Sequence, residues 1–162
     1  MKIKEILAIL NEVTDPEIPV ITIEELGILR EVKIDEKSDT INVYITPTYS
    51  GCPAMDMITV QIKSSLQEHG YSHVNVISLL EPAWTTDWIS DTGRKKLMAY
   101  GISPPVQKTT DSSFLSGKSP IVQCPVCKSF NTEMISRFGS TPCKSLYKCL
   151  ECLEPFDYFK CH

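Results

Sequence analysis

Residues 124–127 read Cys-Pro-Val-Cys and residues 149–152 read Cys-Leu-Glu-Cys. These two C-x₂-C units are separated by 21 residues, a spacing close to that of paired metal-binding turns. Together they predict a tetrahedral four-sulfur site of the kind that zinc prefers, with Cys124, Cys127, Cys149 and Cys152 as ligands. A closed site of this type leaves no open coordination position, so we expect a structural role. Iron in a four-sulfur site, or an iron–sulfur cluster, would use the same residue types.

The residues around this pair of motifs form a small module. Six of the seven cysteines lie in the last 42 residues, and only Cys52 lies before them. An odd count, with no secretion signal, favours metal binding over disulfides. Strand patterns at 132–137, 146–148 and 156–159 are short, and 42 residues cannot bury enough apolar surface to fold unaided. We therefore predict a metal-stapled, zinc-ribbon-like β module over residues 121–162.

Three further metal-binding side chains lie in this module, namely Cys143, Cys161 and His162. They are soft donors close in sequence to the predicted site, so they could form a second, incomplete or labile metal site. The simpler interpretation is that the two cysteines fill space in the core and that His162 belongs to a frayed terminus.

The preceding segment, residues 104–120, is rich in Pro, Ser and Thr, which is a linker composition. Residues 1–103 carry a different pattern, with helical periodicity at 3–13, 54–70 and 90–100 and a short capped helix at 22–27. Strand patterns at 32–34 and 41–45 predict a hairpin, and a strand at 74–80 after the long helix predicts parallel pairing. The sequence thus predicts an α/β (α+β) protein with a small mixed sheet in the first domain.

Cys52 has a specific local context. Pro53 fits the first position of the 54–70 helix, which places Cys52 at the cap, where backbone N–H groups and the helix dipole favour a thiolate. Such placement lowers the pKa of a cysteine and makes it a nucleophile or a metal ligand, although a cap residue that merely packs is equally consistent with the pattern. Asp15 and Glu17 put two carboxylates on one turn, for which a solvated turn is the default interpretation.

Composition and charge exclude some classes of partner. The chain has 162 residues and a formal net charge of −4, and no run of Lys or Arg is longer than two. Residues 121–162 carry five basic against four acidic side chains. This charge gives little electrostatic attraction for nucleic acid or an anionic membrane. No stretch approaches the roughly 20 apolar residues that span a bilayer. We expect a soluble, cytoplasmic protein.

The motifs resemble a known family. Residues 15–19 (Asp-Pro-Glu-Ile-Pro), 46–53 (Thr-Pro-Thr-Tyr-Ser-Gly-Cys-Pro) and 82–85 (Pro-Ala-Trp-Thr) resemble the iron–sulfur-assembly domain shared by the SufT proteins and the cytosolic iron–sulfur targeting factors. The tail, with Phe-Gly-Ser-Thr at 138–141 and Cys-His at its end, is similar to that of the PaaD (PaaJ) accessory proteins of bacterial phenylacetyl-CoA epoxidase systems. The resemblance spans nearly the whole chain.

This resemblance implies a non-catalytic accessory role in aerobic phenylacetate breakdown. It implies iron–sulfur cluster assembly or insertion, with the flavin and iron–sulfur reductase of the epoxidase as client and the iron–sulfur assembly machinery as a further partner. By position, Cys52 would be the reactive cysteine, Asp15 and Glu17 its acidic turn, and the four ribbon cysteines the ligands of a structural zinc. It also favours a functional role for Cys143, Cys161 and His162, and a transient cluster as cargo.

Other functions stay open. Cys52 could be the nucleophile of a redox or transferase enzyme, although no histidine is placed to act as its base. A nucleic-acid-binding ribbon is disfavoured by the low positive charge of the tail. The chain could also be a stably bound structural subunit of the oxygenase.

Overall fold

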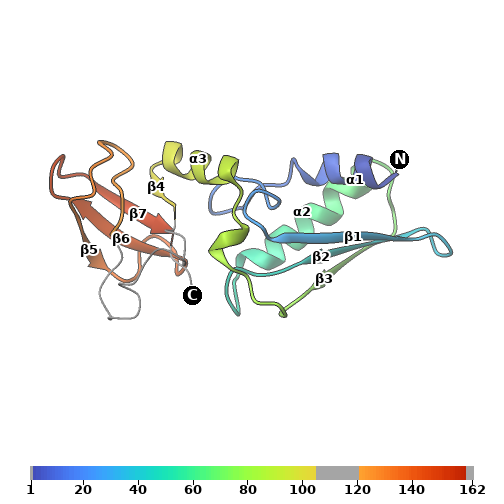
Figure 1. Ribbon diagram of the computed structural model, residues 1–162. Coiled ribbons are helices and arrows are strands. Elements are labelled where there is room, and N and C mark those ends of the chain that lie inside the picture. Colours follow the sequence, from blue (N-terminus) through green and yellow to red (C-terminus); the bar gives the residue numbers. More distant parts are fainter. Residues whose placement is uncertain (1, 105–120, 160–162) are drawn as a thin grey trace. The chain divides into compact units, whose positions relative to one another are not determined.

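The computed structural model describes residues 2–104 and 121–159, which form a mixed α and β fold with two sheets (Figure 1). One sheet has three strands and the other four. The chain divides into two compact units, with the division between Gly93 and Arg94. The predicted fold class is confirmed. None of the helices in the described part of the chain is long and apolar enough to cross a membrane.

The first sheet has the strand order β1–β2–β3. Strands β1 (Leu29–Asp35) and β2 (Thr40–Ile45) form the predicted antiparallel hairpin. Strand β3 (Val74–Ser78) pairs in parallel with β2, and helix α2 (Ala54–Glu68) supplies the crossover between them. The predicted helix and parallel strand are both confirmed.

Helix α1 (Lys2–Leu10) and helix α2 pack against this sheet. One stripe of each helix is buried, because apolar residues recur at spacings of three and four. The buried side chains from the helices are Ile6, Leu10, Ala54, Ile58, Ile62 and Leu66. On β2, Ile41, Val43 and Ile45 alternate with partly exposed residues, so one face of the strand is in the core.

The short helix expected at 22–27 is only a turn, so this prediction is wrong in extent. The reciprocal cap does form: the backbone N–H of Thr22 donates to Glu25 Oε2 and the N–H of Glu25 donates to Thr22 Oγ1. The turn ends at Gly27, whose φ is +78°, a left-handed conformation that glycine adopts without strain. Trp88 packs so close to Gly27 that a Cβ there would lie 2.6 Å from the Trp88 Cβ.

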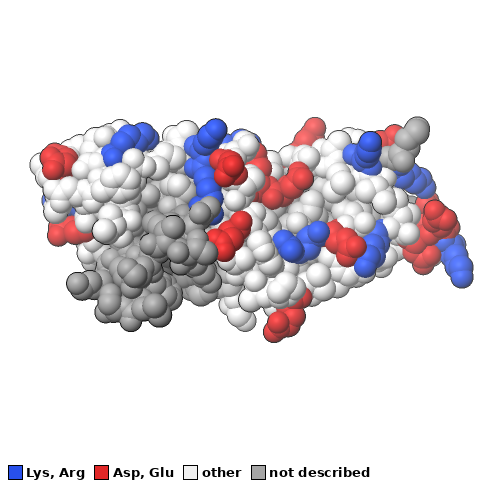
Figure 2. Space-filling model, in the orientation of Figure 1, with Lys and Arg blue, Asp and Glu red and all other residues white. Residues whose placement is uncertain are grey.

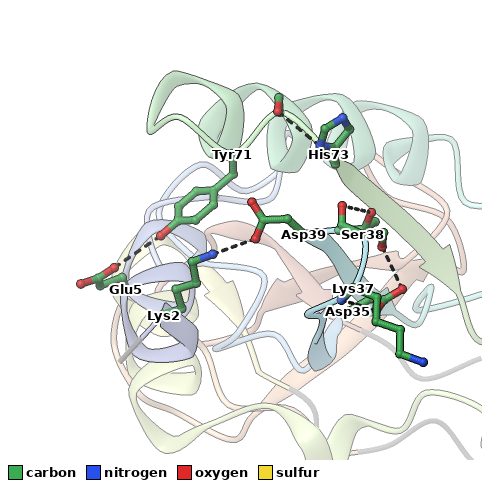
Figure 3. Close-up of polar contacts among 10 residues, drawn as sticks. Lys2, Glu5, Asp35, Lys37, Ser38, Asp39, Tyr71 and His73 are labelled. Atoms are coloured by element: carbon green, nitrogen blue, oxygen red, sulfur yellow. Dashed lines mark hydrogen bonds and ion pairs between the residues drawn. The ribbon is translucent and has the colours of Figure 1, made fainter.

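The tip of the β1–β2 hairpin is tied to its surroundings by exposed polar contacts (Figure 3). Lys2 Nζ lies 2.7 Å from Asp39 Oδ1, which joins the start of α1 to the hairpin turn. The Tyr71 hydroxyl donates to Glu5 Oε2 over 3.4 Å. These contacts lie at the N-terminal ends of β2 and β3, opposite the end from which the loop to α2 leaves.

After β3 the chain forms a short 3₁₀ turn, η1 (Thr86–Trp88), and helix α3 (Asp91–Tyr100). Ser90 Oγ accepts a hydrogen bond from the N–H of Gly93, as a helix N-cap does. The two-residue strand β4 (Ile102–Ser103) then pairs in parallel with β7. The predicted linker at 104–120 lies almost wholly outside the described residues, and the boundaries at 103 and 120 stay predictions.

The second sheet has the order β4–β7–β6–β5. Strands β5 (Thr132–Ser136), β6 (Lys144–Cys149) and β7 (Pro155–Phe159) are antiparallel neighbours, at the positions the sequence predicts. The C-x₂-C units lie before β5 and at the end of β6, so the sheet brings both to one end of the ribbon.

Candidate functional site

The four ribbon cysteines lie together. The Sγ atoms of Cys124 and Cys152 are 3.7 Å apart, those of Cys127 and Cys149 are 3.5 Å apart, and all four lie within 4.8 Å of one another. A tetrahedral zinc site with Zn–S bonds of about 2.3 Å has S···S distances of about 3.8 Å. The donor set therefore fits a single tetrahedral metal ion.

The two C-x₂-C turns have the same backbone conformation. In each, the N–H of the first cysteine donates to a carbonyl five residues later, from Cys124 to Ser129 and from Cys149 to Glu154. The residue after each second cysteine is left-handed, with φ of +66° at Lys128 and +65° at Leu153. This pseudo-twofold arrangement directs two thiols from each turn to one point.

The core of the ribbon is small and includes two of the ligands. Its buried cluster consists of Val122, Cys124, Tyr147, Cys149, Phe156 and Tyr158. The backbone N–H of Cys152 lies 3.5 Å from the Sγ of Cys149. This hydrogen bond is the largest of several, with others from the Glu151 N–H and the neighbouring thiols, that together lower the pKa of Cys149 to about 7. A core of this size needs a further source of stability, and a bound ion would supply it.

Of the three further metal-binding side chains of the tail, the structure describes only Cys143. Cys143 is buried, its Sγ lies 3.0 Å from Thr141 Oγ1, and it is not part of the four-thiol cluster. Cys161 and His162 lie outside the described residues. A second metal site made of these three side chains stays a prediction.

Cys52 lies in the loop that leaves the C-terminal end of β2 and enters α2. The sequence predicts Cys52 as the cap residue of this helix. In the structure the cap residue of α2 is Pro53, with φ of −67° and ψ of −21°, so Cys52 lies one residue before the cap. The N–H of Cys52 donates to the Tyr49 carbonyl, and the Cys52 carbonyl accepts from the N–H of Met55. The side chain is half-buried.

The thiol of Cys52 has a raised pKa, where the sequence predicts a lowered one. Burial is the largest cause, and the charges of Glu17 and Asp15 raise the pKa further. The Ala54 N–H and the Tyr49 side chain act in the opposite direction and lower the pKa, but each has a smaller effect than burial. The helix N-terminus therefore does not dominate, and Cys52 is a thiol at neutral pH.

The acidic turn and the cysteine, 35 or more residues apart in sequence, are thus close enough to interact. Asp15 is buried, and its Oδ1 accepts hydrogen bonds from the backbone N–H groups of Glu17 and Ile18. The turn is held rather than freely solvated. The two carboxylates make the surroundings of the Cys52 thiol more negative.

Tyr49 is the residue of this site that the sequence interpretation missed. Its side chain lies close enough to Cys52 to favour the thiolate and lower the pKa of the thiol, against the larger effect of burial. The only signal in the sequence is its position three residues before Cys52 in the 46–53 segment.

Two family models match different parts of the chain. A family model described as an iron-sulfur cluster assembly protein matches residues 3–76, and one described as the PaaD zinc beta ribbon domain matches residues 108–160. The chain is 45% identical over 160 residues to a putative 1,2-phenylacetyl-CoA epoxidase subunit of Escherichia coli (strain K12), a match that covers 99% of this chain and 93% of that protein. The chain belongs to the PaaD family.

A solved structure agrees with the fold of the first unit. The crystal structure of a DUF59 domain from Bacillus anthracis is 26% identical, with a TM-score of 0.53 over 58% of this PaaD-family chain and 89% of that one. A conserved hypothetical protein from Thermotoga maritima is also 26% identical, with a TM-score of 0.49 over 58% and 91% of the two chains.

Proposed function

We propose that this chain is a non-catalytic accessory subunit of a phenylacetyl-CoA epoxidase system in the cytoplasm, where it aids assembly or insertion of an iron–sulfur cluster. The client is the flavin and iron–sulfur reductase of that system. The observation that carries the proposal is a half-buried thiol, Cys52, that feels the charges of Glu17 and Asp15, in a domain that matches the iron-sulfur cluster assembly family.

The two groups of sulfur ligands have different roles in this proposal. The four ribbon thiols enclose a volume that fits one ion and leave no open position, which suits a permanently bound zinc with a structural role. Cys52 is not one of these four ligands and provides only one sulfur. An iron species bound to it therefore keeps open coordination positions for ligands from a client.

The electrostatics of Cys52 suit a transient ligand. Burial and two nearby carboxylates disfavour an isolated thiolate, so the thiol keeps its proton until a cation arrives. An incoming iron ion offsets the negative charges and replaces that proton. When the cargo moves to a client, the thiol takes a proton back, and the raised pKa favours release over retention.

The test is a comparison of reductase maturation in cells. In a strain whose own gene carries Cys52→Ser, we expect the reductase to purify with less iron and sulfide per flavin, while the zinc content of this protein is unchanged. Ser50→Ala is the matched control, because it changes an exposed side chain in the same loop and leaves every thiol in place. Full cluster occupancy of the reductase in the Cys52→Ser strain would refute the cluster role.

A stably bound structural subunit is the competing function, and the word subunit in the name of the E. coli relative favours it. That function predicts a fixed stoichiometric complex with the oxygenase and a loss of complex, not of cluster, when the chain is absent. Co-purification stoichiometry, measured with the reductase iron content, separates the two.

A further inference from the structure

Strand β3 is a free edge of the first sheet. The N–H of Leu79 donates to the carbonyl of Ile45, so the odd-numbered residues of this segment direct their backbone groups toward β2. The intervening residues direct theirs away from β2, and these are Val74, Val76 and Ser78. Within residues 2–104 and 121–159 no strand pairs with this side of β3.

The two edges of the sheet differ in charge. Edge strand β1 carries Arg30, Glu31, Lys33 and Asp35, the kind of charged edge that prevents strand pairing. Strand β3 reads Val-Asn-Val-Ile-Ser and has no charged residue. In Figure 2, blue and red groups follow β1, while most of the surface along β3 is white. Of the two edge strands, β3 is the one that lacks charged residues to prevent pairing with another strand.

The side of α2 beside this edge carries a single charged residue, Glu68, at its C-terminal end. Helix α1 packs on β1 and α2 on β3, so the side of α2 away from α1 lies next to the free edge. At 3.6 residues per turn, Met57, Gln61 and Ser64 share one side of α2. Leu66 on the other side is fully buried, whereas Met57 is 56% exposed, which identifies the side of Met57 as the outer one.

We propose that two copies of this chain associate through β3 and the adjoining side of α2. A twofold axis through Val76 makes the two β3 strands antiparallel and joins the two three-stranded sheets into one six-stranded sheet. Val76 then pairs with the second copy's Val76, and Val74 with the second copy's Ser78, so every outward backbone group of β3 gains a partner.

A second copy fits this surface better than an isolated peptide strand. The same axis places the two α2 helices side by side on one face of the joined sheet, so the Met57 side chains of the two copies pack between them. A peptide would satisfy the backbone of β3 but leave these side chains exposed. Along β3, uncharged surface meets uncharged surface, with no like charges opposed.

The test is sedimentation velocity of the full-length, zinc-loaded protein over a concentration series. We expect a species of twice the 18.2 kDa chain mass. Asn75→Lys with Ile77→Lys puts charge on the open face of β3 and should weaken the dimer at least tenfold. Glu31→Lys is the matched control, because it adds a lysine to the other edge and should leave the dimer unchanged.

Met57→Glu is a second variant, at an exposed helix position that tolerates a polar residue, and it should weaken the dimer without loss of fold. Hydrogen exchange at Val74, Val76 and Ser78 should slow as concentration rises. The inference is overturned if the wild type is a monomer at every concentration. It is equally overturned if folded Met57→Glu dimerises like the wild type, or if Glu31→Lys disrupts the dimer.

Discussion

The Sγ atoms of Cys127 and Cys149 lie 3.5 Å apart although the residues are 22 positions apart in sequence. This contact joins the two C-x₂-C turns at one end of a ribbon whose buried core has six members. Because structural zinc contributes about 10–16 kcal/mol of apparent binding free energy, and that energy is also folding free energy, the ion is expected to decide whether the ribbon folds.

Replacement of one ligand should therefore abolish both metal binding and ribbon structure. We expect Cys149→Ser to purify without zinc and to lose the dispersed amide resonances of residues 121–159. Metal analysis with two-dimensional NMR checks this. Cys143→Ser should keep its ion, since Cys143 lies outside the four-sulfur group, and loss of zinc in that variant would place Cys143 among the ligands.

Chelation of the ion should affect the two units differently. Removal of the ion should unfold the ribbon while residues 2–93 keep their structure, because they form a compact unit with its own sheet and its own buried helix faces. Resonances of Ile58, Ile62 and Leu66 are convenient reporters. A single cooperative loss of both sets of resonances would contradict this independence.

Gly27 should be far less tolerant of substitution than Gly51, although both have φ near +77°. A Cβ at Gly51 would meet nothing within 4 Å, so Gly51→Ala should cost only the left-handed strain, about 1–2 kcal/mol. Gly27→Ala adds a clash with Trp88, for about 2–5 kcal/mol in total. Urea unfolding of both variants measures the difference, and equal costs would show that Trp88 yields without penalty.

The raised pKa of Cys52 predicts slow alkylation at neutral pH. The ordinary thiol pKa is 9.0 and burial with Glu17 and Asp15 moves it upward, so the rate should keep rising above pH 9. Tyr49→Phe removes a donor to the thiolate and should raise the pKa further, whereas Glu17→Gln should lower it. Peptide-resolved mass spectrometry of the zinc-loaded protein follows Cys52 alone. A rate that levels off below pH 8 would contradict the assigned environment.

Spacing in the sequence predicts those features that depend on nearby residues. The C-x₂-C pairs, the hairpin at 29–45 and the helix of residues 54–68 all follow from local pattern. The reciprocal cap between Thr22 and Glu25 is also predicted correctly, but the helix behind it is not. The segment is only a turn, and it ends at the left-handed Gly27, which Trp88, 61 positions away in sequence, approaches closely.

Features set by tertiary contact could not be predicted. Strand β4 has two residues, too few to show a period, and only pairing with β7 defines it. The pKa of Cys52 depends chiefly on burial, which outweighs the hydrogen bond from the Ala54 N–H at the start of the helix, and carboxylates 35 or more residues away add a smaller effect. Asp15 is buried because its carboxylate accepts two backbone N–H groups, a contact invisible in composition.

The central claim is that the four ribbon thiols hold a fixed zinc while Cys52 binds iron transiently. It is tested most directly by anaerobic loading of the zinc-bound protein with ferric iron, sulfide and a thiol reductant. We predict that the wild type gains the visible absorption of an iron–sulfur species and retains one zinc per chain, while Cys52→Ser retains the zinc and gains no absorption. Equal absorption in both proteins, or iron taken up only as zinc is lost, would contradict it.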